Sequence, residues 1–314
     1  MYQGGETLNR FFIITIDTEG DNLWAHKDIK TPVSTENSKY IERFQLLCEK
    51  YGFVVTYLTN YEMAMEKVFV DIGEEGLRRK TIEIGAHEHA WNSPPYFPLI
   101  KSPFYRGKPY LSEYPLLVVR RKLEYITKTL EDVFQCKITS HRGGKWCLNK
   151  TIARELLRLG YISDCTVTPR LSWQSTPGWS IMAGRTGGPD FRNNPNCPHI
   201  LCEDREGKKI IEIPATLVSK TDNTVPAWFR PNGRNVETML GMIDYIYESE
   251  VDYIEFMLHS SELMPGGSPT FRNVGQIEVL YENLIEIFEK LKSKGYTGIG
   301  LSEYSKIKLE EMGE

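Results

Sequence analysis

Strand-like and helix-like segments alternate along the chain, and this alternation limits the fold more than any other feature of the sequence. Short apolar runs predict strands, and most are followed by a segment whose apolar residues recur every three to four positions, as in an amphipathic helix. The predicted strands are 10–17, 53–58, 81–86, 137–142, 161–167, 208–217, 253–260 and 296–301, and the predicted helices are 34–52, 60–68, 113–135, 149–160, 237–249 and 273–294. Strands separated by helices indicate right-handed βαβ units and a parallel sheet.

About seven or eight such units in 314 residues favour one α/β domain, a distorted (β/α)7-type barrel spanning residues 1–314. An open doubly wound sheet is the alternative, although no Gly-x-Gly-x-x-Gly motif or P-loop follows any predicted strand. Two long segments, 92–112 and 168–206, interrupt the alternation. Loops of this length in a compact domain usually serve function, so we expect them at the C-terminal mouth of the barrel.

Composition excludes several classes of partner. The formal net charge of -4 and the 25% of charged residues are ordinary for a globular enzyme, and they do not predict a nucleic-acid-binding surface. The N-terminus lacks a basic region followed by a long apolar run, and no apolar run reaches the ~18 residues that span a bilayer. We therefore expect a cytoplasmic protein without a membrane span.

Two pairs of side chains predict a metal site. His87 and His89 follow the predicted strand 81–86, and alternate residues of an extended segment point the same way, so both imidazoles can reach one point. Asp17 and Glu19 have the same spacing at the end of the first strand. One carboxylate with two imidazoles leaves a coordination position open for water, as catalytic zinc sites do. The spacing does not decide which carboxylate is the ligand and which is a base, and the plainer alternative is a pair of surface histidines and an acidic turn.

Other candidate residues stand at further strand ends, where the functional groups of a parallel barrel gather. Arg142 can orient a neighbouring carboxylate and lower its pKa through a forked ion pair, and His141 should then point away from the face that Arg142 uses. His259 ends an apolar strand and can serve as a general acid or a further ligand. Indole rings near these strand ends, those of Trp24, Trp91 and Trp146, can stack on sugar rings, although packing is their commoner role.

With these segments in this order, the chain resembles the polysaccharide deacetylase family, carbohydrate esterase family 4, across roughly residues 10–302. "TIDTEGD" resembles the first motif of the family, "GAHEHAW" the histidine motif and "HRGG" the arginine motif. "GYISDCT" is similar to the Asp-Ser-Ser strand, "IIEIPAT" to the strand after it, and "MLHSS" to the Leu-His-Ser motif.

The resemblance implies a metal-dependent hydrolase that removes N-acetyl groups from an acetamido sugar or glycan precursor. The residues implied are Asp17 as base, Glu19, His87 and His89 as ligands of Zn²⁺ or another divalent transition metal, Arg142 as tether of Asp17, His259 as general acid and Leu258 as a wall of the acetyl pocket. In the mechanism implied, the metal lowers the pKa of water from ~15.7 toward ~7 and polarises the carbonyl, while Asp17 takes a proton and His259 protonates the departing amine.

The motifs also depart from the family pattern. Thr18 separates the two carboxylates, Trp91 holds the position of the usual second histidine, and Gly143-Gly144 follow Arg142 in place of proline. The stretches "HSSELMPGGSPTF" and "GGPDFRNNP" resemble a subgroup associated with lipopolysaccharide or capsule assembly. Two alternatives remain: a hydrolase of a small cyclic amide or ureide on the same scaffold, and a carbohydrate-binding protein without metal. The sugar and its carrier, the native metal and the oligomeric state are not predicted.

Overall fold

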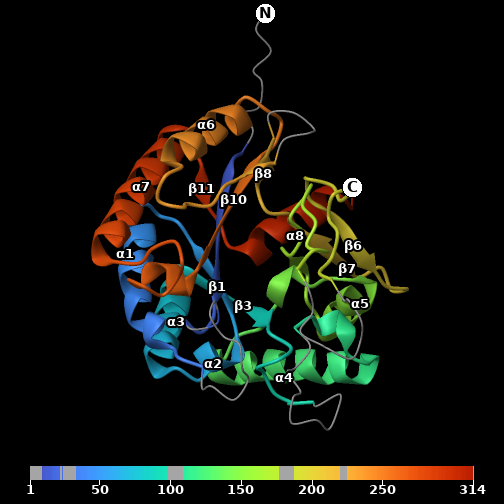
Figure 1. Cartoon of the computed structure of the whole chain (residues 1–314). Coiled ribbons are helices and arrows are strands. Elements are labelled where there is room, and N and C mark those ends of the chain that lie inside the picture. The colour runs from blue at the N-terminus through green and yellow to red at the C-terminus, as the bar shows by residue number, and fades with distance from the viewer. Residues whose placement is uncertain are drawn as a thin grey trace, which may run out of the picture.

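The computed structural model describes residues 9–21, 23, 33–97, 109–176, 187–219 and 225–313, and it shows a curled sheet surrounded by helices (Figure 1). Trp24 and parts of both long loops lie outside these residues. The main sheet contains β1 (Phe11–Thr18), β2 (Val55–Thr59), β3 (Ile82–Glu88), β4 (Ser140–Gly143), β5 (Ser163–Asp164), β6 (His199–Glu203), β7 (Lys209–Glu212), β10 (Tyr253–His259) and β11 (Thr297–Gly298), and a small second sheet contains β8 (Leu217–Val218) and β9 (Ala227–Trp228).

The helices lie between these strands along the chain. They are α1 (Ile41–Lys50), α2 (Tyr61–Ala64), α3 (Lys67–Arg79), α4 (Leu116–Phe134), α5 (Lys150–Leu159), α6 (Val236–Tyr247), α7 (Val274–Ser293) and α8 (Leu301–Glu311). Four short 3-10 turns are η1 (Glu36–Tyr40), η2 (Leu111–Glu113), η3 (Gly144–Trp146) and η4 (Ser260–Leu263). Among the described residues, no helix combines the length and the apolar character that crossing a lipid bilayer requires.

The order of the strands confirms the predicted barrel. In the part of the chain that the structure describes, the seven strands β10-β1-β2-β3-β4-β5-β7 run parallel in that order, and β6 pairs antiparallel with the edge of β7. Among these described strands, no pairing joins β7 to β10 to close the sheet. Two bonds bridge this gap, one from the Tyr253 hydroxyl to the Pro214 carbonyl at 3.0 Å and one from the Glu255 amide to Thr216 Oγ1 at 2.8 Å. The fold is therefore a distorted, incompletely closed (β/α)7 barrel.

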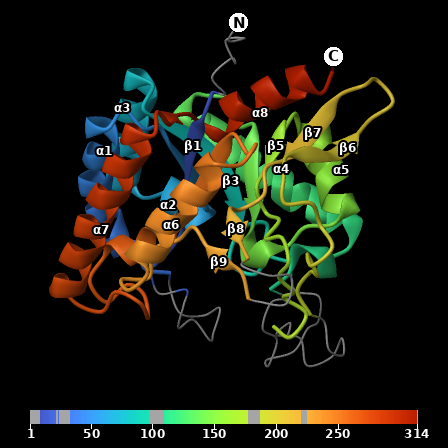
Figure 2. The same cartoon turned by 90° about the horizontal axis from the view of Figure 1, so that it is seen from above.

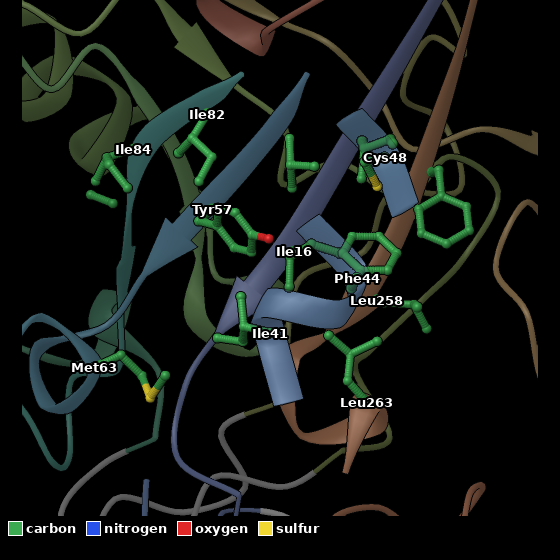
Figure 3. Packing of buried hydrophobic residues seen from close by; sticks show 14 of the residues in the cluster. Ile16, Ile41, Phe44, Cys48, Tyr57, Met63, Ile82, Ile84, Leu258 and Leu263 are labelled. Atoms are coloured by element: carbon green, nitrogen blue, oxygen red, sulfur yellow. The ribbon is translucent and has the colours of Figure 1, made fainter. Parts of the chain in front are cut away.

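Both faces of the strands are buried, as expected of a parallel sheet covered by helices. Alternate residues of β1, such as Ile14 and Ile16, face outward and join a large apolar cluster with Ile41 and Phe44 of the η1–α1 segment (Figure 3). The intervening residues face the inside of the barrel, where Ile13 packs in a smaller cluster with Tyr304 of α8. Side-chain direction along each strand is thus fixed by alternation.

Helix α8 closes the end of the barrel at which the strands begin. The Leu301 amide donates to Thr56 Oγ1 at 3.1 Å, and the Ser302 amide donates to Glu83 Oε2 at 3.0 Å. Thr56 and Glu83 lie near the starts of β2 and β3. Figure 2 shows α8 on the opposite side of the sheet from β8 and β9. The other end, where the strands finish, is left for the long loops.

Several predicted elements differ from the observed ones. The predicted helix 60–68 is two helices, α2 and α3, and α3 continues to Arg79 because Gly73 and Gly76 allow it to pack closely against the sheet. Part of the predicted loop 168–206 is strand β6, which forms a hairpin with β7. The predicted strands 161–167, 208–217 and 296–301 are shorter, and α8 was not predicted because two of its buried residues are serines, which blur its apolar pattern.

Candidate active site

The polar strand ends come together at the open mouth of the barrel. Asp17 of β1 stands opposite His259 of β10 in the register of the sheet, and His87 of β3 stands opposite Arg142 of β4. Glu19 follows β1 by one residue, and His89 follows β3 by one residue. Alternation places the side chains of Asp17, His87 and Arg142 on the inner face, and His141 points the other way to bond Asp164 at 2.6 Å, as predicted.

Glu19, His87 and His89 form a buried cluster of three donor groups. Glu19 Oε2 lies 2.9 Å from His89 Nε2 and 3.3 Å from His87 Nε2, and the two Nε2 atoms are 3.0 Å apart. Burial would raise the pKa of Glu19, but the two imidazoles, His89 first, outweigh it and hold this pKa well below its usual range. The same burial lowers the pKa of His89, which favours the neutral ring that binds metal ions.

The cluster fits a divalent transition metal in donor type and spacing. Ligands ~2.0–2.2 Å from a tetrahedral Zn²⁺ are roughly 3.3 Å from one another, close to the separations found here. His87 Nδ1 lies 2.9 Å from the Arg142 carbonyl oxygen, which can only accept, so Nδ1 carries the proton and Nε2 presents a lone pair to the cluster. His89 is held by stacking on Trp91, with ring centroids 4.3 Å apart.

Asp17 lies beside this cluster, held by a buried arginine. Arg142 Nη1 donates to Asp17 Oδ1 at 2.8 Å, and Nη2 donates to Glu255 Oε1 at 2.6 Å. Burial raises the pKa of Asp17, but Arg142, followed by His87 and His259, outweighs it and lowers this pKa below its usual value. Asp17 Oδ2 faces His259 Nε2 at 3.8 Å and His87 Nε2 at 4.0 Å. The two carboxylates therefore have different partners: Glu19 contacts His87 and His89, and Asp17 forms an ion pair with Arg142.

His259 is positioned by two residues that sequence reasoning missed. Its Nδ1 lies 3.2 Å from Glu262 Oε2, and the same oxygen accepts a bond of 3.0 Å from the His259 amide. Arg230 Nη2 donates to Glu262 Oε2 at 2.7 Å and lies 3.0 Å from His259 Nδ1. The spacing of His259 and Glu262, three residues apart in a turn, was a usable signal. Arg230 lies 29 residues before His259, and the residues around Arg230 in the sequence give no signal of a functional site.

Aromatic side chains line the cavity over these groups. The cavity has a volume of about 320 Å³, and its walls include Trp91, Tyr110, Trp146, Trp173 and Trp228. Trp146 stacks on Trp173 with ring centroids 6.0 Å apart, and the ring centroids of Trp228 and Trp146 are 5.2 Å apart. Trp173 and Trp228 come from loop and edge segments and were not predicted as site residues. Trp24 lies outside the described residues.

The structure does not place Leu258 in the cavity. Its side chain is fully buried and belongs to the outer apolar cluster, close to Leu263 (Figure 3). The expectation that Leu258 lines an acetyl pocket is therefore wrong. Alternation is the reason, because His259 faces inward and its neighbour in the strand must face outward.

Comparisons with known proteins show the fold. No protein-family model and no curated protein matches the sequence. Among solved structures, a candidate polysaccharide deacetylase from Mycobacterium smegmatis has a TM-score of 0.57 at 12% identity, covering 95% of this chain and 90% of that one. A 4-alpha-glucanotransferase from Thermococcus litoralis has a TM-score of 0.52 at 15% identity, covering 94% of this chain and 40% of that one. At these identities the similarity establishes a shared architecture: this chain has the same fold as the M. smegmatis protein.

Proposed function

We propose that the chain is a metal-dependent carbohydrate N-deacetylase of the polysaccharide deacetylase family. The observation that carries the proposal is the meeting of Glu19, His87 and His89, whose ligand atoms all lie within 4.8 Å of one another. Asp17 and His259 stand beside them, as a base and an acid would in amide hydrolysis. The ordered motif resemblance and the shared fold support the same assignment.

The three clustered residues would hold Zn²⁺ or another divalent transition metal. A bound divalent ion supplies Lewis acidity toward the amide carbonyl and lowers the pKa of water from ~15.7 toward ~7. Asp17 accepts the proton at Oδ2, because Arg142 already occupies Oδ1. Arg142 also keeps Asp17 ionised, since it is the largest influence opposing the effect of burial on the pKa of Asp17.

His259 donates the proton that the departing amine requires. Its Nε2 faces the same space as Asp17 Oδ2, 3.8 Å away, so one group accepts and the other donates at a single reacting centre. Glu262 and Arg230 fix the ring from its Nδ1 side. These two residues act through His259 and are positioning residues.

The walls of the cavity favour a saccharide over a small cyclic amide or ureide. Four indole rings surround the polar floor, and aromatic faces stack on the apolar faces of sugar rings. The meeting of three metal-binding side chains supports an enzyme over a metal-free binding protein. We further propose a glycan precursor of lipopolysaccharide or capsule type as substrate, on the resemblance of segments 259–271 and 187–195. A cytoplasmic location stays a prediction.

Acetate release tests the proposal directly. The metal-loaded protein is incubated with N-acetylated mono- and oligosaccharides, with and without a chelator, and with a cyclic amide and a cyclic ureide for comparison. We expect acetate from at least one saccharide, loss of release with chelator, and recovery on adding Zn²⁺. Hydrolysis of the cyclic compounds alone would contradict the proposal, as would a metal-loaded protein that releases no acetate from any saccharide.

A further inference from the structure

A strained turn at the end of β4 aims a lysine into the cavity. Lys145 and Trp146 both have left-handed backbone conformations, with φ of 53° and 58°. Such conformations are costly for residues other than glycine and persist where the surroundings impose them, often at functional sites. The two residues before this turn are closely packed glycines. A Cβ on Gly143 would lie 2.2 Å from the Cys147 carbonyl oxygen, and one on Gly144 would lie 2.3 Å from His89 Cδ2.

Among the described residues that line the cavity, Lys145 and Arg230 are the lysine and the arginine, and their surroundings differ. Arg230 also lines the cavity, but it is paired with Glu262 at 2.7 Å. Lys145 Nζ lies 5.5 Å from the centre of the Trp91 ring, and among the described residues it makes no hydrogen bond and has no carboxylate oxygen within 4.0 Å. It is half-buried, so water compensates its charge only in part.

Burial lowers the pKa of Lys145, and the nearby carboxylate of Glu19 opposes this effect by stabilising the charged ammonium. Under the proposed function, Glu19 binds a divalent cation, and its negative charge is then offset by that cation. Lys145 is left close to a second positive charge without a counter-charge of its own, which is an unfavourable arrangement. A negatively charged group on the bound sugar would restore the balance.

We propose that Lys145 selects the substrate by binding an anionic group, a carboxylate or a phosphate, carried by the acetamido sugar. This inference rests on the proposed function, because it takes the cavity to be the sugar site. The neighbouring Trp91 and Trp146 provide apolar faces for the sugar ring, and the ammonium provides the charge-assisted bond. The substrate class is therefore an anionic N-acetylated saccharide.

Binding to the metal-loaded protein tests the inference without turnover. The dissociation constants of N-acetylglucosamine, N-acetylglucosamine 6-phosphate and N-acetylmuramic acid, which carries a carboxylate, are measured by calorimetry or tryptophan fluorescence. A charge-assisted bond corresponds to about tenfold to a hundredfold in affinity. We expect the wild-type protein to bind at least one of the charged sugars about tenfold or more tightly than the neutral one. The preferred one identifies the anionic group.

Variants of Lys145 separate charge from structure. Lys145→Met keeps the length of the side chain and should bind the charged sugar no better than the neutral one, while Lys145→Arg should keep the preference. Lys150→Met, at an exposed position in the first turn of α5, is the matched control and should leave all affinities unchanged. Zn²⁺ should bind Lys145→Met as tightly as the wild-type protein or more tightly, because a neighbouring positive charge has been removed.

Three results would overturn the inference: wild-type protein that binds no sugar, wild-type protein that binds charged and neutral sugars equally, and Lys145→Met that weakens both by the same factor. Acetate release from the same samples separates this inference from the proposed function. A preference for the charged sugar without any acetate release would contradict the deacetylase proposal alone. Equal release from neutral and charged sugars, with equal affinities, would contradict the role of Lys145 alone.

Discussion

Among individual residues, Arg142 links the candidate site to the interior of the barrel. Its guanidinium is fully buried, bonds both Asp17 and Glu255, and donates through Nε to the Cys165 carbonyl at 3.0 Å. Thr15 adds a hydroxyl bond to Glu255. Buried ion pairs contribute little net stability when intact, but losing one partner leaves the other charge uncompensated. Arg142 therefore contributes to stability as well as to the proposed chemistry.

Replacement of Arg142 by methionine should lower the free energy of unfolding by about 3–5 kcal/mol, because two carboxylates lose their buried counter-charge. Urea denaturation measures this loss. Arg120→Met is the matched control, since Arg120 is 40% exposed and its partner Glu155 keeps Arg158, so its cost should stay below about 1 kcal/mol. Equal losses in the two variants would contradict the role given to Arg142.

The effect of Arg142 on stability should also depend on pH. Arg142 helps to lower the pKa of Asp17, so the stabilisation is present above the ordinary pKa of aspartate, ~3.9, and is lost as the pH falls through the folded pKa. In Arg142→Met, burial is no longer opposed by Arg142, so Asp17 is neutralised at a higher pH than in the wild-type protein, and its neutralisation removes the cost of the unpaired buried charge. The difference in stability between the two proteins should shrink from pH 7 to pH 4. A difference that stays constant over this range would argue against an electrostatic cause.

Glu262 is expected to matter through His259. The substitution Glu262→Gln removes the carboxylate that accepts bonds from the His259 amide and from Arg230, and it leaves Arg230 without its ion-pair partner. We expect kcat for acetate release to fall about tenfold to a hundredfold, less than the ~10²–10⁴-fold that a general acid itself contributes, because the acid remains but is less well positioned. Zn²⁺ content should not change. An unchanged kcat would show that Glu262 does not position the proton donor.

At the level of elements, helix α3 depends on two glycines to reach the sheet. A Cβ on Gly76 would lie 2.2 Å from Ile82 Cδ1 and 2.9 Å from Ile82 Cβ, and a Cβ on Gly73 would lie 2.6 Å from Phe134 Cε1. Glycine within a helix costs roughly 1 kcal/mol relative to alanine. The stabilisation from close packing of α3 on β3, the strand that carries His87, outweighs this cost of glycine to helix stability.

Gly76→Ala should therefore destabilise the protein in spite of its better helix propensity. We expect a loss of about 1–3 kcal/mol, because the new methyl group must displace Ile82 in a packed core. Gly241→Ala in α6 provides the control, since nothing lies within 4 Å of its Cβ position, and it should stabilise by about 0.5–1 kcal/mol. Thermal and urea unfolding measure both changes. Stabilisation by both substitutions would show that α3 does not pack as described.

Across the molecule, the part of the fold that could be predicted is the part governed by local periodicity. The alternation of strands and helices predicted the barrel, and the two-residue repeat of a strand predicted that the side chains of His141 and Arg142 point in opposite directions. The same repeat would have placed Leu258 outside the cavity, but the family resemblance assigned it to the wall. Strands β6 and β9 escaped prediction because tertiary pairing, more than local sequence, defines them, and α8 escaped it because its buried serines blur its apolar pattern.

The candidate site was only partly accessible from the sequence, for a related reason. Glu19, His87 and His89 stand at the C-terminal ends of β1 and β3, so parallel register brings them to one end of the barrel. Arg230 and Trp228 come from the segment after β7, and their position depends on the path of the chain across the mouth. No periodicity encodes that path. The sequence therefore indicated the clustered side chains of Glu19, His87 and His89 but not Arg230 and Glu262, which contact His259.

Calorimetric titration of Zn²⁺ into the metal-free protein tests the central claim, that Glu19, His87 and His89 form one divalent metal site. We predict one ion per chain for the wild-type protein and for His259→Ala, and binding at least about a hundredfold weaker for His87→Ala and Glu19→Gln. His199→Ala, away from the cluster, is the matched control, and circular dichroism verifies that each variant is folded. Binding of Zn²⁺ by His87→Ala with wild-type stoichiometry and affinity would contradict the claim.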